Sequence, residues 1–198
     1  MNSPHRVTDP PRLLGKADDG RILSSEEFAS AEFEEGWVYE RVQRRLVVMF
    51  PDGEGGIRAM DPWMERLFLY KAAHHQLVQY VVNQAWVRID DDTDRFPDIA
   101  VYLVSEKAPP IPDRVPEIIF EIVSGTRRDR ERDYDTKRAT YEKIGVREYV
   151  IVDRFLPGVL VLENSPNGFR ERRLTPADRY ETPLLPGFSV PLSEVLSS

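Results

Sequence analysis

The chain has 198 residues and contains no cysteine. This absence excludes disulfide bonds and argues against zinc or iron–sulfur centres, which usually rely on thiolate ligands. It also suits a reducing compartment, and we expect a cytoplasmic location. Any metal held by this chain is therefore expected to be a hard cation with oxygen ligands, such as Mg²⁺ or Mn²⁺.

Long hydrophobic runs are also missing. None approaches the ~20 residues that a membrane-spanning helix needs, and the N-terminus lacks the apolar segment of a signal peptide. Residues 1–20 are polar and contain proline, so we expect a disordered tail there. The remaining residues, 21–198, are expected to form a single domain, because 41% hydrophobic and 31% charged residues are ordinary for a globular protein.

A positive net charge is the third absence. The formal charge is −7, which argues against nonspecific binding to nucleic acid. The segment from Arg127 to Arg147 is the exception, with eight Lys/Arg against five Asp/Glu. Its basic residues fit either a solvated helix face with weak ion pairs or a phosphate-binding surface.

The residue that stands out is Glu121. It interrupts an apolar, β-branched run, Glu117-Ile118-Ile119-Phe120-Glu121-Ile122-Val123-Ser124, which is too short for a helix and predicts a buried strand. A carboxylate with apolar neighbours on both faces of a strand is costly unless it is paired or bound to a metal. Glu121 therefore predicts a partner.

Asp98 is the first candidate partner. It opens a second predicted strand, Asp98 to Val104, directly after Pro97. If the two strands are neighbours, Asp98 and Glu121 share one crevice, where a divalent cation or a proton must relieve their repulsion.

Lys137 is the second candidate. The segment from Asp129 to Gly145 predicts a helix whose apolar stripe is Tyr134, Lys137, Tyr141 and Ile144. The lysine therefore points toward the sheet and the two acids. The alternative is a surface lysine paired with Asp133 at i, i+4. Two acids, a lysine and a metal suit phosphodiester hydrolysis.

Several stretches resemble a known family. Pro97-Asp98 and Glu121-Ile122-Val123 are similar to the PD-(D/E)XK nuclease superfamily, with Val123 at the position of its usual lysine. More narrowly, the chain resembles the bacterial restriction endonuclease family called Uma-two over roughly residues 39 to 196. The stretches that carry this resemblance are Phe120-Glu121-Ile122-Val123-Ser124, Arg132-Asp133-Tyr134, Lys137-Arg138, Tyr141, Gly145-Val146, Glu148-Tyr149 and Leu184-Leu185-Pro186-Gly187-Phe188.

The resemblance implies roles for particular residues. Asp98 and Glu121 would bind the metal together with the Ile122 carbonyl, and Lys137 would supply the lysine from the following helix. Tyr39-Glu40 matches a pair common in the family, so Glu40 is a further catalytic candidate, with an exposed strand carboxylate as the alternative. His75 also fits a family pattern, although a histidine on an apolar helix is more often structural.

The order of the remaining segments predicts an α/β fold with a mixed sheet. We expect a hairpin over Trp37–Phe50, a long helix from Asp61-Pro62 to about Trp86, and a charged, solvated turn over Val87–Arg95. After the helix at Asp129–Gly145, we expect a buried strand at Glu148–Asp153 and then a C-terminal hairpin over Gly158–Arg173. By resemblance, the core is restriction-endonuclease-like, a central sheet flanked by helices.

Three functions are therefore open. The first is a Mg²⁺-dependent endonuclease acting on DNA, working as a homodimer because a duplex has two strands related by two-fold symmetry. The second is a nuclease-fold protein that no longer cuts and serves as a binding or regulatory module. The third is a structural ion-pair network without chemistry. The complete set of Asp98, Glu121 and Lys137 favours the first.

Overall fold

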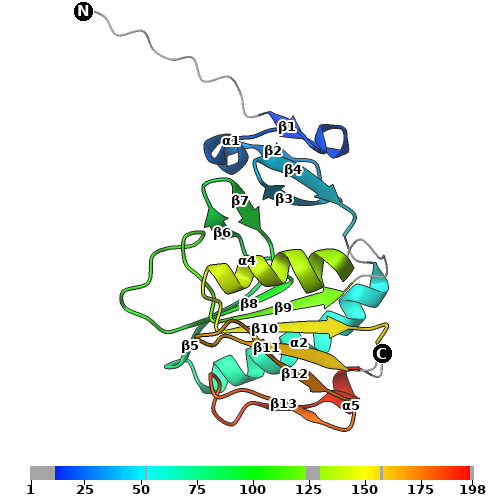
Figure 1. The fold of residues 1–198 in the computed structure, drawn as a ribbon, viewed down its shortest axis with the longest axis vertical. Coiled ribbons are helices and arrows are strands. Elements are labelled where there is room, and N and C mark those ends of the chain that lie inside the picture. The colour runs from blue at the N-terminus through cyan, green and yellow to red at the C-terminus, as the bar shows by residue number, and fades with distance from the viewer. Residues whose placement is uncertain (1–11, 52, 124–129, 157, 197–198) are drawn as a thin grey trace, which may run out of the picture. The chain divides into compact units, whose positions relative to one another are not determined.

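The computed structural model describes residues 12–51, 53–123, 130–156 and 158–196. The chain forms two compact units. The first comprises Met1–Pro51 and Asp90–Asp94, and the second comprises Asp52–Ile89 and Arg95–Ser198. Most elements of both units are labelled in Figure 1. The prediction of one domain over residues 21–198 stays a prediction.

The first unit is built around a β-hairpin. Strands β3 (Val38–Val42) and β4 (Arg45–Met49) pair antiparallel, and Gln43 and Arg44 turn between them with positive φ angles of 50° and 65°. Two consecutive positive φ angles are the hallmark of a type I′ turn, whose twist matches that of the strands. The hairpin predicted over Trp37–Phe50 is therefore confirmed.

Shorter elements complete this unit. Helix α1 (Ser25–Ser30) begins with a capping box, in which the Ser24 hydroxyl and the Glu27 carboxylate each accept the other residue's backbone N–H. Of the predicted tail, residues 1–11 lie outside the described residues. Strand β1 (Leu13–Leu14) pairs parallel with β2 (Glu32–Phe33), and η1 (Lys16–Asp18) is a 3₁₀ turn.

The charged segment Val87–Arg95 is not the solvated turn that the sequence predicts. It forms strands β6 (Val87–Asp90) and β7 (Thr93–Arg95). Asp94 is fully buried and accepts a hydrogen bond from Arg41 Nε of β3 at 2.7 Å. The prediction is wrong because the burial of Asp94 depends on a guanidinium far away in the sequence, which a run of aspartates does not reveal.

The second unit contains a six-stranded mixed sheet in the order β12-β11-β10-β9-β8-β5. The strands are β5 (Val78–Asn83), β8 (Ile99–Leu103), β9 (Ile118–Val123), β10 (Glu148–Asp153), β11 (Val159–Glu163) and β12 (Arg170–Leu174). Strands β9 and β10 pair in parallel, and the other neighbours are antiparallel. Every residue of β9 and β10 is buried, so these are the central strands.

The predicted helix over Asp61–Trp86 is wrong at both ends. Helix α2 runs over Glu54–Ala73 with Pro62 inside it, and the residues that follow form β5. The three valines of Val78–Asn83 suit a strand, and pairing with β8 supplies its backbone hydrogen bonds. Proline favours the first turn of a helix, which is why Pro62 suggested a later start.

Helices cover both faces of the sheet (Figure 1). On one face, Trp63 of α2 packs against Phe120 with ring centroids 5.2 Å apart. On the other, Tyr141 packs against Tyr149 at 5.0 Å. Strands β13 (Arg179–Glu181) and β14 (Ser189–Pro191) and helix α5 (Leu192–Val195) complete the chain. The predicted mixed sheet flanked by helices and the C-terminal hairpin β11–β12 are confirmed.

Two further observations concern polarity. Glu148, at the start of β10, is buried and accepts a hydrogen bond from the Tyr180 hydroxyl, and burial raises its pKa above the ordinary value.

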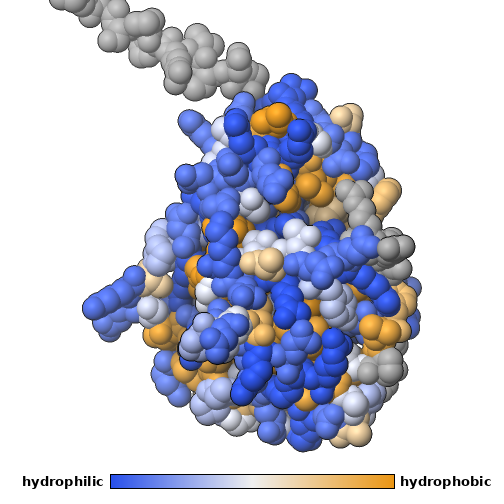
Figure 2. Space-filling model, viewed as in Figure 1, coloured by the Kyte–Doolittle hydropathy of each residue, from blue (hydrophilic) through white to orange (hydrophobic). Residues whose placement is uncertain are grey.

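Within the part of the chain that the structure describes, no helix is both long and apolar enough to cross a membrane. The face shown in Figure 2 is mostly hydrophilic, with small hydrophobic patches between the charged side chains.

Candidate active site

Glu121 is the centre of the candidate site. It lies on the middle strand β9, is 2% exposed, and uses both carboxylate oxygens. Its Oε1 accepts a hydrogen bond from the Tyr141 hydroxyl at 2.8 Å, and its Oε2 lies 2.8 Å from Lys137 Nζ. Two donors on opposite oxygens fix the orientation of the carboxylate and oppose the rise in its pKa that burial causes.

The helical segment that carries Lys137 is not a regular α-helix. It runs as a π-helix, η2 (Arg132–Lys137), and continues as α4 (Arg138–Lys143). Lys137 is 3% exposed, and its Nζ also lies 3.3 Å from Asp133 Oδ1 one turn earlier. The predicted inward orientation of the lysine is confirmed, and the alternative pairing with Asp133 exists beside it. Short π-helical segments occur frequently at functional sites.

Asp98 joins this group from the neighbouring strand. It directly precedes β8, and its Oδ2 accepts a hydrogen bond at 2.7 Å from the backbone N–H of Ile122, the residue after Glu121. The two acids therefore belong to adjacent strands of one sheet, as the sequence predicts. Ile122 contacts Asp98 through its backbone N–H, while a metal-binding role for its carbonyl stays a prediction.

The electrostatics of the group follow from its burial. Burial raises the pKa of Glu121 to about 8, Lys137 opposes this shift, and the negative charges of Asp98 and Asp133 add to it. The three carboxylates share this group with two cations, since Arg132 Nε also lies 3.3 Å from Asp133 Oδ1. An additional positive charge at this place would relieve the repulsion between the acids.

Two tyrosines take part that the sequence did not assign to the site. The helical spacing predicts only an apolar role for Tyr141, yet its hydroxyl donates a hydrogen bond to Glu121. Tyr149 of β10 donates from its hydroxyl to the backbone carbonyl of Asp133 at 2.9 Å, which fastens η2 to the sheet. Both residues are fully buried, and a buried tyrosine hydroxyl needs a polar partner. In the sequence, a tyrosine in a stripe that faces the sheet is therefore a signal for a polar partner inside the protein.

The donor chemistry suits a divalent cation. Asp98 and Glu121 offer hard carboxylate oxygens on adjacent strands, and Mg²⁺ commonly binds through one or two carboxylates while keeping several water ligands. Among the described residues, no group of three or more His, Cys, Asp or Glu side chains is placed to hold a metal. The candidate ligands for such a cation are the carboxylates of Asp98 and Glu121.

Glu40 and His75 are the two remaining candidates from the sequence. Glu40 is buried on β3 in the first unit, so the alternative of an exposed strand carboxylate is wrong, while a catalytic role stays a prediction. His75 is exposed in the turn after α2, and not on the helix that the sequence predicts. The neighbouring His74 ends α2 and stacks on Tyr70 at 4.0 Å.

The mixed sheet, the helices on both faces and the two acids on adjacent strands define a nuclease-like fold of the restriction-endonuclease class. The family model of Uma2, described as "Putative restriction endonuclease", matches residues 25–193, and the chain belongs to this family. A crystal structure from Anabaena variabilis, described as that of "a putative nuclease belonging to DUF820", has the same fold. It matches with a TM-score of 0.69 and 13% identity over 88% of this chain and 98% of that one. A comparison with curated proteins gave no match.

Proposed function

We propose that this protein is a Mg²⁺-dependent endonuclease that hydrolyses phosphodiester bonds in DNA. The observation that supports this proposal most is the buried ion pair of Lys137 and Glu121, whose charged atoms are 2.8 Å apart. Glu121 lies on the strand next to the one that Asp98 precedes. Membership of a restriction endonuclease family supports the same reaction. In this proposal Asp98, Glu121 and the Ile122 carbonyl are metal ligands.

The chain's own residues have separate tasks in this mechanism. A bound divalent cation supplies charge for the phosphate and lowers the pKa of a water molecule. The ammonium of Lys137, which lies beside Glu121 and Asp133, would position the attacking water or neutralise charge on the phosphate. Tyr141 keeps Glu121 in one orientation, so the carboxylate needs no rearrangement when substrate arrives.

Cleavage of supercoiled plasmid tests the proposal. We expect Mg²⁺ to support nicking by the wild type, EDTA to stop it, and Lys137→Met to lose at least about 100-fold in rate, as expected for loss of a positioned charge. Lys143→Met is the matched control, since it removes an exposed lysine from the same helix. Circular dichroism verifies that both variants are folded.

The outcomes separate the candidate functions. Full activity in Lys137→Met would mean that the lysine is only an ion-pair partner. Mg²⁺ binding by calorimetry without any cleavage of DNA or RNA would favour the alternative of a nuclease-fold binding protein. Neither binding nor cleavage would leave a structural ion-pair network.

Assembly, location and a third acid belong to the same proposal. A homodimer would let one site act on each strand of a duplex, and light scattering that gives a monomer at tens of micromolar would contradict it. Glu40 is proposed as a further catalytic acid, so Glu40→Gln is expected to reduce the nicking rate with little change in fold. A cytoplasmic location fits a chain without cysteine.

A further inference from the structure

The loop after strand β10 exposes an aromatic side chain. Phe155 is 52% exposed, and its neighbour Leu156 is 48% exposed. In Figure 2 hydrophobic residues gather at the edge of the molecule where, in Figure 1, β10 ends and the chain turns back. A single half-exposed phenylalanine is common on protein surfaces, so the residues that contact its ring decide whether it is a binding group.

Two arginines lie against the ring of Phe155. The guanidinium carbon of Arg130 is 5.4 Å from the ring centroid, and that of Arg154 is 5.1 Å away. Both distances are within the range of cation–π interactions. The ring and the two guanidinium groups thus form one surface group, which we call the Phe155 platform (Arg130, Arg154 and Phe155).

The buried side chain of Asp153 holds two members of this platform in place. Its side chain is 2% exposed, and its Oδ1 accepts from Arg130 at 3.2 Å and from the backbone N–H of Phe155 at 2.9 Å. Its Oδ2 accepts from the hydroxyl of Tyr134 at 3.3 Å. A single buried carboxylate therefore fixes the helix arginine and the loop aromatic together, which pre-organises the group for binding.

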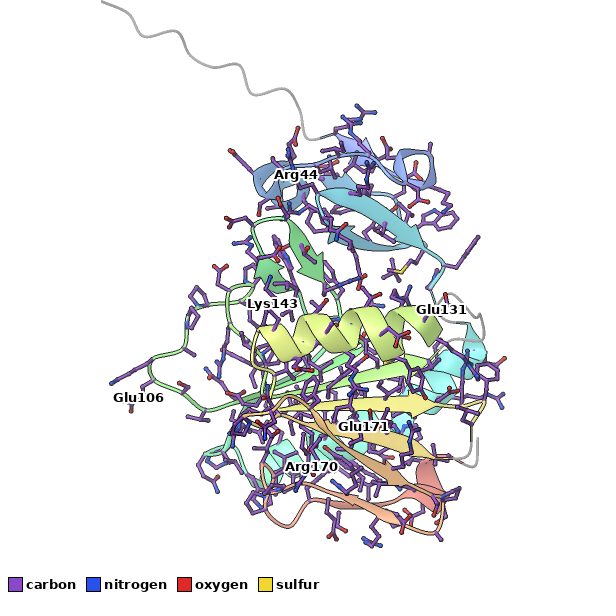
Figure 3. All side chains as sticks on the ribbon, viewed as in Figure 1. Arg44, Glu106, Glu131, Lys143, Arg170 and Glu171 are labelled. Carbon is purple, nitrogen blue, oxygen red and sulfur yellow. The ribbon has the colours of Figure 1, made fainter. Side chains whose placement is uncertain are left out.

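The platform is tied to the strand that carries Glu121. Arg154 Nε donates to the carbonyl of Val123, two residues beyond Glu121, at 3.3 Å, and Asp153 pairs with Val123 in the β9–β10 register. Arg130 precedes Lys137 by seven residues on the same helical segment. Figure 3 shows Glu131, next to Arg130, at the end of the helix toward which the arrows of β9 and β10 point.

We propose that the Phe155 platform binds an unpaired nucleotide of the substrate strand. The base stacks on the aromatic and guanidinium surfaces, and the guanidinium groups contact the flanking phosphates. Aromatic rings beside arginines are the usual means by which proteins grip single-stranded nucleic acid without reading its sequence. The substrate class is then single-stranded or locally opened nucleic acid, an inference that rests on the proposed function.

Binding without cleavage tests this inference. Fluorescence anisotropy in EDTA compares a short labelled single-stranded DNA, the matching RNA and the blunt DNA duplex. We expect the single strands to bind more tightly than the duplex, and Phe155→Ala to weaken single-strand binding by about 5- to 100-fold. Phe68→Ala is the matched control, because Phe68 on α2 is 46% exposed and lies outside the platform; it should bind like the wild type.

An abasic nucleotide moved along the oligonucleotide distinguishes stacking from a structural effect. One position is expected at which loss of the base weakens the wild type but leaves Phe155→Ala unchanged. Arg154→Gln should lower the salt dependence of binding by about 0.7 in log–log slope, the effect of one lost contact to a single strand. Phe155→Leu, which keeps an apolar side chain, serves if the alanine variant does not fold.

The results decide between the two proposals. Unchanged binding in Phe155→Ala or in Phe155→Leu, an equal loss at every abasic position, or duplex bound as tightly as single strand would each overturn the platform. If the wild type nicks plasmid under no condition while Phe155→Ala still weakens single-strand binding, the nuclease proposal is overturned and the platform proposal is supported. Preference for DNA or for RNA among the single strands supports the inference either way and identifies the substrate.

Discussion

Replacing Lys137 by methionine should strongly destabilise the protein, because the lysine is buried among acids. Its ammonium lies 2.8 Å from Glu121 and 3.3 Å from Asp133, and all three side chains are at most 4% exposed. Methionine keeps most of the apolar volume of the lysine stem, so the effect reports the charge. Removing one partner of a buried pair typically costs about 3–5 kcal/mol, since the other charge stays buried without compensation.

A double-mutant cycle measures how much of this cost comes from Glu121. Lys137→Met alone should lower the free energy of unfolding by about 3–5 kcal/mol, which corresponds to roughly 6–20 °C in the melting temperature of a chain of this size. Glu121→Gln removes the carboxylate charge. The two substitutions together should therefore cost less than the sum of the single ones, by about 1–3 kcal/mol.

Urea unfolding in EDTA, followed by circular dichroism, provides the measurement, with Lys143→Met as the control on the same helix. The reasoning would be refuted by a cost for Lys137→Met of about 0.5 kcal/mol or less, the value of an exposed i, i+4 pair. Strict additivity with Glu121→Gln would also contradict it, because two groups in contact at 2.8 Å cannot be energetically independent.

Three further outcomes are expected. Saturation with Mg²⁺ at 100 times its Kd should add about 2.7 kcal/mol of stability, and Asp98→Ala should abolish this gain in a thermal melt; a gain that persists would contradict the site. Burial raises the pKa of Glu148 above 4.5, so the folded state holds this proton more tightly and the wild type loses stability as pH rises above about 4.5. Glu148→Gln should therefore become progressively more stable than the wild type in urea titrations from pH 4 to 8, and a constant difference would count against it. Asp94→Ala should lower the free energy of unfolding by about 3–5 kcal/mol, because the buried Arg41 would lose its carboxylate partner. Asp92→Ala should lower it by under 1 kcal/mol, because Asp92 pairs with Arg44 at 3.9 Å on the surface.

The central strands were predictable because their physical signals are local. A short β-branched run with one acid predicts a buried strand and a partner for that acid, and the structure has both at Glu121. The orientation of Lys137 followed from the spacing of the apolar residues on its own helix. In each case the residues that carry the signal lie within a few turns or one strand of each other.

The errors arose where distant residues decide the outcome. The apolar run after His75 fits a buried helix or a strand, and only its pairing with β8 selects the strand β5. The burial of Asp94 requires Arg41, and the role of the Tyr141 hydroxyl requires Glu121. A side-chain contact across such a sequence distance leaves no periodic pattern to read. The π-helical turn of η2 likewise has no signature in composition.

That π-helix makes the site depend on the number of residues as well as on their kinds. In a π-helix the backbone bonds join residues five apart, one more than in an α-helix. Deleting one residue from Arg132–Lys137 would let the segment relax to a regular α-helix, which would change the spacing of Asp133 and Lys137 around the helix axis. A mutational scan of this segment should therefore find single-residue deletions more damaging than most substitutions, so that the spacing of its residues would matter as well as their identity.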